Sequence, residues 1–197
     1  MDARTIDTYN QMAKEYDEET VEFWNTFPRM FLDRFIELSH DTVLNVGSGP
    51  GRDGLILQSA GLDVVCLDAS QAMIDLSTAR GLKSILGDLL KLPFENESFN
   101  SVWAYTSLLH IQKSQIAMAL AEIHRILKPN GIFALGMIEG DEELYRASSG
   151  VALERWFSFY QKEELEKQLI ESGFEIVYFE MFKPRSKNYL QFILRKK

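Results

Sequence analysis

Residues 43–52 read VLNVGSGPGR, and this stretch decides the fold. The apolar run over 42–46 is typical of a buried strand, and glycines follow directly at 47, 49 and 51. Glycine allows a tight turn and lets a ligand approach the main chain closely. A helix expected over 52–60 would direct its free N–H groups at that ligand, which favours a carboxylate or phosphate. The stretch predicts a ligand-binding loop, although a purely structural loop would also explain the glycines.

The chain continues as short β-rich runs that alternate with amphipathic helices. Strands are expected at 42–46, 63–67, 83–86, 99–105 and 132–137, and helices at 52–60, 71–80 and 114–127. Ser70 is a good N-cap, Gly61 and Gly81 are good helix stops, and residues 128–131 (KPNG) predict a turn. This alternation predicts βαβ units and therefore a parallel sheet.

The two ends of the chain follow a different pattern. A helix is expected at 161–172, and β-rich runs at 174–182 and 189–194 are joined by a short polar loop. So short a loop permits antiparallel pairing but not a parallel crossover, so the sheet should end in a hairpin. Ahead of the first strand, helices at 7–18 and 28–39, the second starting near Pro28, should cover one edge or mouth of the sheet.

Composition limits the class of protein and its partners. The 197 residues, 46% hydrophobic and 25% charged, fit one globular domain. No apolar run reaches the ~18 residues that a membrane span needs, and the polar, acidic residues 1–20 do not form a targeting peptide. The net charge of −8 disfavours nucleic acid. The C-terminal end is nevertheless basic, through Lys183, Arg185, Lys187, Arg195, Lys196 and Lys197.

Cysteine and histidine usage adds two expectations. Cys66 is the only cysteine, which suits a reducing, cytoplasmic location. His40, His110 and His124 are scattered without the spacing of a metal site, so no metal is expected.

Two aspartates stand at the tips of the strands that follow the glycine loop. Asp68 lies about twenty residues after the loop, where a carboxylate can accept both ribose hydroxyls of a nucleoside. Asp88 follows the third strand, where it can accept from an adenine amino group while the Leu89 N–H meets a ring nitrogen. A helix cap for Asp68 and a solvated loop residue for Asp88 are the alternatives. Because neighbouring parallel strands end at one crevice, the three elements together predict an adenosine site.

Residues 43–137 resemble the class I S-adenosylmethionine-dependent methyltransferase family. The matching pieces are the glycine loop 47–51, LDAS at 67–70, GDLLKLPF at 87–94 and EIHRILKPNG at 122–131. The resemblance implies an α/β, Rossmann-like, seven-stranded, mostly parallel sheet with helices on both faces and a C-terminal antiparallel hairpin. One domain would span 1–197: an N-terminal helical cap (1–40), a cofactor-binding core (41–137), an acceptor-side insertion (138–160), and a helix plus terminal hairpin (161–197).

The same resemblance implies S-adenosylmethionine as the cofactor and assigns its contacts. Gly47, Ser48 and Gly49 would meet its methionine and ribose portions, Asp68 the ribose, Ala69 and Met73 the adenine face, and Asp88 and Leu89 the adenine edge. Tyr105 and Thr106 would lie beside the transferred methyl, Arg52 would pair with the cofactor carboxylate, and Tyr9 and Tyr16 would close over the site. Asn45 stands where the family usually has an acidic residue, which predicts weakened cofactor binding.

The implied function is in-line methyl transfer to a small-molecule acceptor that the sequence does not identify. His110 follows the fourth strand and is the candidate general base, with a structural histidine as the alternative. The stretch 138–160 joins acidic residues to aromatics, which would suit a cationic or planar acceptor; a solvated acidic loop followed by core aromatics is the other interpretation. A non-catalytic binding protein and a transfer-RNA-directed methyltransferase are rival functions. A nicotinamide dehydrogenase fits less well, because Arg52 occupies the third glycine position of its motif.

Overall fold

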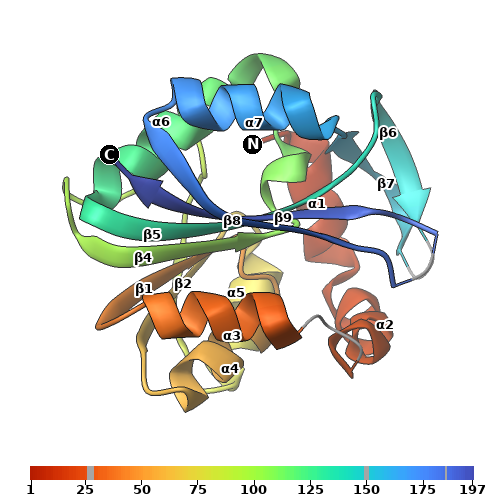
Figure 1. The fold of residues 1–197 in the computed structure, drawn as a ribbon. Coiled ribbons are helices and arrows are strands. Elements are labelled where there is room, and N and C mark those ends of the chain that lie inside the picture. Colours follow the sequence, from red (N-terminus) through yellow and green to blue (C-terminus); the bar gives the residue numbers. More distant parts are fainter. Residues whose placement is uncertain (26–28, 149–150, 185) are drawn as a thin grey trace.

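A seven-stranded sheet forms the centre of the protein, with α3, α4 and α5 on one face and α6 and α7 on the other (Figure 1). The computed structural model describes residues 1–25, 29–148, 151–184 and 186–197. The strand order is β3-β2-β1-β4-β5-β9-β8, in which β1 to β5 run parallel and β9 runs antiparallel to both neighbours. The strands of this sheet are β1 (Thr42–Val46), β2 (Asp63–Asp68), β3 (Lys83–Leu86), β4 (Phe99–Tyr105), β5 (Leu127–Ile138), β8 (Phe174–Phe182) and β9 (Tyr189–Lys196).

Helices fill the connections and the N-terminal segment. They are α1 (Ala3–Gln11), α2 (Ala13–Asn25), α3 (Arg29–Leu38), α4 (Arg52–Ser59), α5 (Gln71–Ala79), α6 (Ile116–Ile126) and α7 (Lys162–Glu171), with short 3-10 turns η1 (Leu108–His110) and η2 (Lys113–Gln115). Within the described ranges, no helix combines the length and apolar character needed to cross a membrane.

The core has two layers because alternate residues of a strand face opposite sides of the sheet. On one side Val43 belongs to a buried cluster with Trp103 and Phe35, whose rings lie 5.0 Å apart. On the other side Leu44 packs in a second cluster with Leu120 of α6. The fold class predicted from the sequence is confirmed, including the C-terminal antiparallel hairpin of β8 and β9. Ser70 caps α5 as predicted, since its Oγ accepts from the Met73 N–H.

The N-terminal helices differ from the prediction. The single helix expected at 7–18 is two helices, α1 and α2, which meet at Met12. α1 starts earlier because Asp2 caps it, accepting from the Thr5 N–H at 2.8 Å. α1 lies along β7 and ends at Met12 instead of continuing into α2. Two hydrogen bonds hold it there: Thr5 Oγ1 accepts from the Trp156 N–H, and Thr8 Oγ1 donates to the carbonyl of Glu154. Pro28, the expected start of the second helix, lies outside the described residues.

Two further elements depart from the expected pattern. β5 begins at Leu127, which pairs with Phe99, and its pairing resumes only where Ile132 meets Ser101. The turn predicted over 128–131 is therefore a bulge inside the strand. The stretch 138–160 forms an antiparallel hairpin of β6 (Glu143–Ser148) and β7 (Val151–Ser158), which the sequence did not reveal as strands.

Candidate functional site

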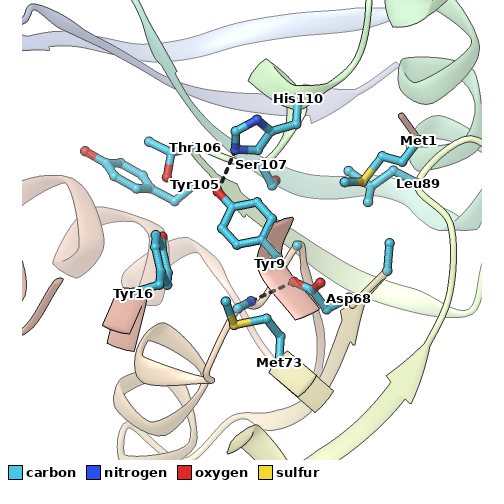
Figure 2. A pocket seen from close by; sticks show the side chains of 13 residues that line it. Met1, Tyr9, Tyr16, Asp68, Met73, Leu89, Tyr105, Thr106, Ser107 and His110 are labelled. Carbon is cyan, nitrogen blue, oxygen red and sulfur yellow. Dashed lines mark hydrogen bonds between the residues drawn. The ribbon is translucent and has the colours of Figure 1, made fainter. Parts of the chain in front are cut away.

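A pocket opens where β1, β2 and β4 end, beneath the N-terminal helices (Figure 2). Including its mouth, it has a volume of about 450 Å³. Eleven of the fourteen residues predicted to bind cofactor or act in catalysis line it, together with Met1 and Ser107. The predicted residues that it brings together are Tyr9, Tyr16, Gly47, Gly49, Asp68, Ala69, Met73, Leu89, Tyr105, Thr106 and His110.

The glycine loop is shaped by a close approach and by backbone conformation. Gly47 has φ +65°, and a Cβ on it would lie 2.2 Å from the Cβ of Ser107. Gly49 has φ +50° and faces open space, since a Cβ there would meet only the Tyr16 ring, at 3.8 Å. The loop therefore packs tightly against the end of β4 at Gly47 and stays open to a ligand at Gly49.

Asp68 joins the loop to the start of α5. One carboxylate oxygen accepts from the Gly49 N–H and the other from the Ser70 N–H, both at 2.9 Å. Burial raises the pKa of this carboxyl above its usual value, and the hydrogen bonds from Ser70 and Gly49 oppose that effect. Each carboxylate oxygen has a second acceptor position, so Asp68 retains the capacity to accept from the hydroxyls of a ribose.

A chain of hydrogen bonds crosses the pocket from the hairpin to β4's end. The Arg155 guanidinium donates to Tyr9 Oη at 2.8 Å, and Tyr9 Oη lies 2.8 Å from His110 Nε2. His110 Nδ1 lies 2.6 Å from the main-chain carbonyl oxygen of Trp156. A carbonyl can only accept, so Nδ1 carries the proton and Nε2 accepts from the Tyr9 hydroxyl. The chain thus holds a neutral imidazole and fixes Tyr9 over the pocket (Figure 2).

Three side chains of the pocket, His110, Tyr9 and Tyr105, are kept uncharged by their burial. Burial, with the charge of Arg155, lowers the pKa of His110 to about 3, despite the opposing hydrogen bond to Trp156. Burial raises the pKa values of Tyr9 and Tyr105. At neutral pH these three side chains are uncharged, and none of them is a strong proton acceptor.

Three predicted cofactor residues lie outside the pocket lining. Arg52 donates to the carboxylate and carbonyl of Asp17 in α2, at 2.7 and 2.6 Å. Asp88 accepts from the amino group of Met1 at 2.6 Å. Ser48 is buried, and its N–H donates to the carbonyl of Leu67 at 3.0 Å.

Asn45 does not contact the pocket either. It is buried beneath the loop, with its amide nitrogen 4.0 Å from the Cys66 sulfur. The acidic group in this region is Asp53, which accepts from the Trp103 indole N–H at 2.7 Å. Burial raises the pKa of Asp53 to about 6, although the bond from Trp103 lowers it. Asp53, like Asn45, is not part of the pocket lining.

The aromatics of the 138–160 stretch belong mainly to the core. Phe157, Phe159 and Tyr160 are buried, and the rings of Phe157 and Phe159 stack 5.8 Å apart. Glu143 accepts from the Lys113 N–H and the Ser158 hydroxyl. The structure favours core aromatics over an aromatic wall for a cationic acceptor.

Sequence reasoning missed three residues that shape the site. Ser107 lines the pocket, and its buried Oγ has no partner among the described residues, which suits a ligand hydrogen bond. Asp17 anchors α2 to Arg52 and also accepts from Arg80 at 2.6 Å. Arg155 reaches Tyr9 from β7, and no local signal could have placed it there because the hairpin was not foreseen. Ser107 and Asp68, with the open backbone at Gly49, fit an adenosyl group.

Comparisons with known proteins identify methyltransferases as similar in sequence and fold. A methyltransferase-domain family model matches residues 44–135. A demethylmenaquinone methyltransferase of Renibacterium salmoninarum is 31% identical over 129 residues, which cover 62% of this chain and 54% of that protein. The chain thus spans about half the length of this curated relative.

Solved structures share the fold. A methyltransferase of Methanosarcina mazei superposes with a TM-score of 0.75 at 17% identity, over 86% of this chain and 97% of that one. The Burkholderia thailandensis 1,6-didemethyltoxoflavin-N1-methyltransferase, solved with its acceptor and S-adenosylhomocysteine, gives 0.72 at 20% identity, over 98% and 88%. The chain shares the α/β fold of S-adenosylmethionine-dependent methyltransferases. Over residues 44–135 it is also similar to the methyltransferase-domain family.

Proposed function

We propose that this protein transfers a methyl group from S-adenosylmethionine to a small-molecule acceptor. The observation that carries the proposal is the joint lining of one pocket by the open backbone at Gly49, the carboxylate of Asp68 and the aromatic cover of Tyr9 and Tyr16. The residues proposed to hold the cofactor are Gly47, Gly49, Asp68, Ala69, Met73 and Leu89, with Ser107 as an addition.

The sulfonium of the bound cofactor supplies a methyl group that is already strongly electrophilic. The protein's task is then to hold the acceptor in line and to exclude water, and orientation of this kind contributes about 7–11 kcal/mol in favourable intramolecular reactions. Tyr9 and Tyr16, whose rings meet edge to face at 5.3 Å, close the pocket from the side of α1 and α2. Tyr105 and Thr106 line the pocket at the end of β4 and would border the transferred methyl.

His110 has a positioning role in this proposal. Its Nε2 already accepts from Tyr9, and a pKa of about 3 makes it a weak base at neutral pH. A proton from the acceptor would reach it only through the Tyr9 hydroxyl. An acceptor that arrives without a proton to lose suits this pocket better.

An RNA acceptor receives less support than a small molecule. Part of the basic C-terminal end is already paired, since the buried Lys196 Nζ donates to the carbonyl of Leu127 and the partly exposed Arg195 lies 3.9 Å from Glu175. Arg185 lies outside the described residues. The small-molecule acceptor therefore remains the proposal.

A thermal-shift titration with S-adenosylmethionine, S-adenosylhomocysteine and NAD tests the cofactor. Ligand binding to the native state raises the unfolding temperature, so the first two should stabilise the protein and NAD should not. Asp68→Asn should weaken S-adenosylhomocysteine binding about tenfold, the effect of losing ~1.4 kcal/mol of charge-assisted bonding. Asp75→Asn is the matched control, because Asp75 is exposed on α5 and accepts from Gln71. Stabilisation by NAD alone, or equal losses in both variants, would refute the proposal.

An acceptor panel with methyl-labelled cofactor tests the transfer itself. A demethylmenaquinone analogue belongs in the panel because of the named activity of the Renibacterium relative. Cofactor binding without turnover on any member, including the anionic acceptors considered below, would favour the non-catalytic binding protein.

A further inference from the structure

Two arginines face each other across the β6–β7 hairpin. Arg146 of β6 is the register partner of Arg155 of β7. Directly opposite residues of an antiparallel pair project from the same face, and like charges placed this way destabilise the pairing. That face looks inward, because the Arg155 guanidinium lies 5.2 Å from the Phe157 ring, which belongs to the core, and Arg146 lies 5.8 Å from Phe159. The arrangement would be stabilised by an anion held between the two guanidinium groups.

A third cation approaches from the turn between β8 and β9, which lies beside the hairpin (Figure 1). Lys187 lines the same open hollow as Arg146. Burial lowers the pKa of Lys187, and the charges of Arg146 and Arg155 lower it further. Within the part of the chain that the structure describes, neither Arg146 nor Lys187 forms an ion pair with a carboxylate.

Carboxylates also line this hollow. They are Glu139, Asp141 and Glu142. Glu139 accepts from the Asn188 side chain at 2.6 Å, and Asp141 and Glu142 are exposed. Burial is the main cause of the lowered pKa of Lys187, and the charges of Arg146 and Arg155 act in the same direction.

The cation group adjoins the proposed methyl-transfer pocket through Arg155. Its guanidinium lies 5.0 Å from the centre of the Tyr9 ring and donates to Tyr9 Oη. Tyr9 in turn lines the pocket and contacts His110. Arg155, the register partner of Arg146, thus stands on the hairpin side of Tyr9, where an acceptor rather than the cofactor would approach.

We propose that the acceptor carries an oxyanion, a carboxylate or a phosphate, and that Arg146, Arg155 and Lys187 bind it. Guanidinium groups match the planar geometry of such oxyanions and bind them in bidentate fashion. This assignment rests on the proposed methyltransferase function, of which it specifies the substrate class.

The test is anion binding to protein saturated with S-adenosylhomocysteine, at constant ionic strength set with chloride. The probes are inorganic phosphate, benzoate and the neutral isostere benzamide, followed by thermal shift. Benzoate or phosphate should stabilise the wild type and benzamide should not, and the two anions distinguish the carboxylate from the phosphate source. Arg146→Gln and Lys187→Gln should each weaken anion binding about tenfold, as expected for the loss of a charge-assisted bond worth ~1.5–3 kcal/mol. The double variant should abolish it.

Lys183→Gln is the matched control, since Lys183 is an exposed lysine in the same turn. It should change anion binding less than twofold. Arg155→Gln carries a greater risk of unfolding because Arg155 is buried, so the decision rests on the two more accessible cations. The proposal is overturned if neither anion stabilises the wild type, if benzamide does so equally, or if the variants bind like Lys183→Gln. Failure of S-adenosylhomocysteine to bind would instead overturn the proposed function, and anion binding to the free protein would still report on the cation group.

Discussion

His110 should make the stability of this protein fall steeply in mild acid. Its imidazole is buried and neutral, with Nδ1 donating to the Trp156 carbonyl and Nε2 accepting from Tyr9. Protonation would put a second N–H against the Tyr9 hydroxyl, which already receives a bond from Arg155, and would add a positive charge beside that arginine. The folded state resists this change, so the pKa falls from 6.5 to about 3.

The size of the effect follows from proton linkage. A histidine whose pKa is lower in the folded state binds more protons when unfolded, so stability is lost as the pH falls below 6.5 and the loss is complete near pH 3. One pKa unit corresponds to ~1.4 kcal/mol. Between pH 7.5 and pH 4.5 the unfolded histidine becomes protonated and the folded one does not, which costs about 3 kcal/mol.

Urea unfolding of the wild type and of His110→Asn at both pH values measures this cost. An asparagine Nδ2 can replace the imidazole Nδ1 as donor to Trp156, and it does not titrate. The variant loses the bond to Tyr9 at both pH values, so this loss cancels. The free energy of unfolding of the wild type, relative to that of the variant, should therefore fall by about 3 kcal/mol between pH 7.5 and pH 4.5. His40→Asn, at an exposed position, should follow the wild type. Parallel pH profiles of His110→Asn and wild type would refute a neutral, buried His110.

Two substitutions near the glycine loop give further predictions. Gly47→Ala should lower the free energy of unfolding by about 3 kcal/mol, because the added methyl would overlap Ser107 and the left-handed backbone would be strained. Gly81→Ala is the control: it has the same backbone strain but open space around it, so it should cost about 1 kcal/mol. Equal losses for the two variants in urea unfolding would contradict the steric explanation. Asn45→Asp should leave S-adenosylmethionine affinity unchanged in calorimetry and cost about 2 kcal/mol of stability at pH 8, since it buries a second carboxylate near Asp53. Tighter cofactor binding, or the same cost in an Asp53→Asn background, would contradict that placement.

The pocket floor could be predicted because its parts follow strands directly. Gly47 and Asp68 end adjacent parallel strands, and parallel strands bring their carboxyl ends to one edge whatever the rest of the chain does. Their continuous apolar runs place these strands without knowledge of distant contacts. Local pattern was therefore sufficient for the fold class and for most of the pocket lining.

The walls of the pocket depend on contacts between distant segments, which local pattern does not contain. The break at Met12 arises because Thr5 and Thr8 bond to β7, some 150 residues later. The position of Arg155 depends on a hairpin register in which charged and aromatic residues alternate too irregularly to indicate strands. Asp53, at the start of α4, accepts from the Trp103 indole of β4, a contact that only tertiary packing reveals.

Arg52 shows how such contacts redistribute charge around the loop. The resemblance assigned it to the cofactor carboxylate, but Asp17 accepts from Arg52 and from Arg80, and all three side chains are largely buried. Arg52 and Arg80 thus share the Asp17 carboxylate of α2. This contact links α2, which covers the pocket, to the glycine loop beneath it. The loop N–H groups of Gly47, Ser48, Gly49 and Gly51 already donate to Leu67, Asp68 and Ser48, so the group left for a cofactor carboxylate is the N-terminal end of α4, whose dipole favours an anion. We therefore expect the first turn of α4, positioned by the glycine loop, to bind that carboxylate, rather than the charge of Arg52.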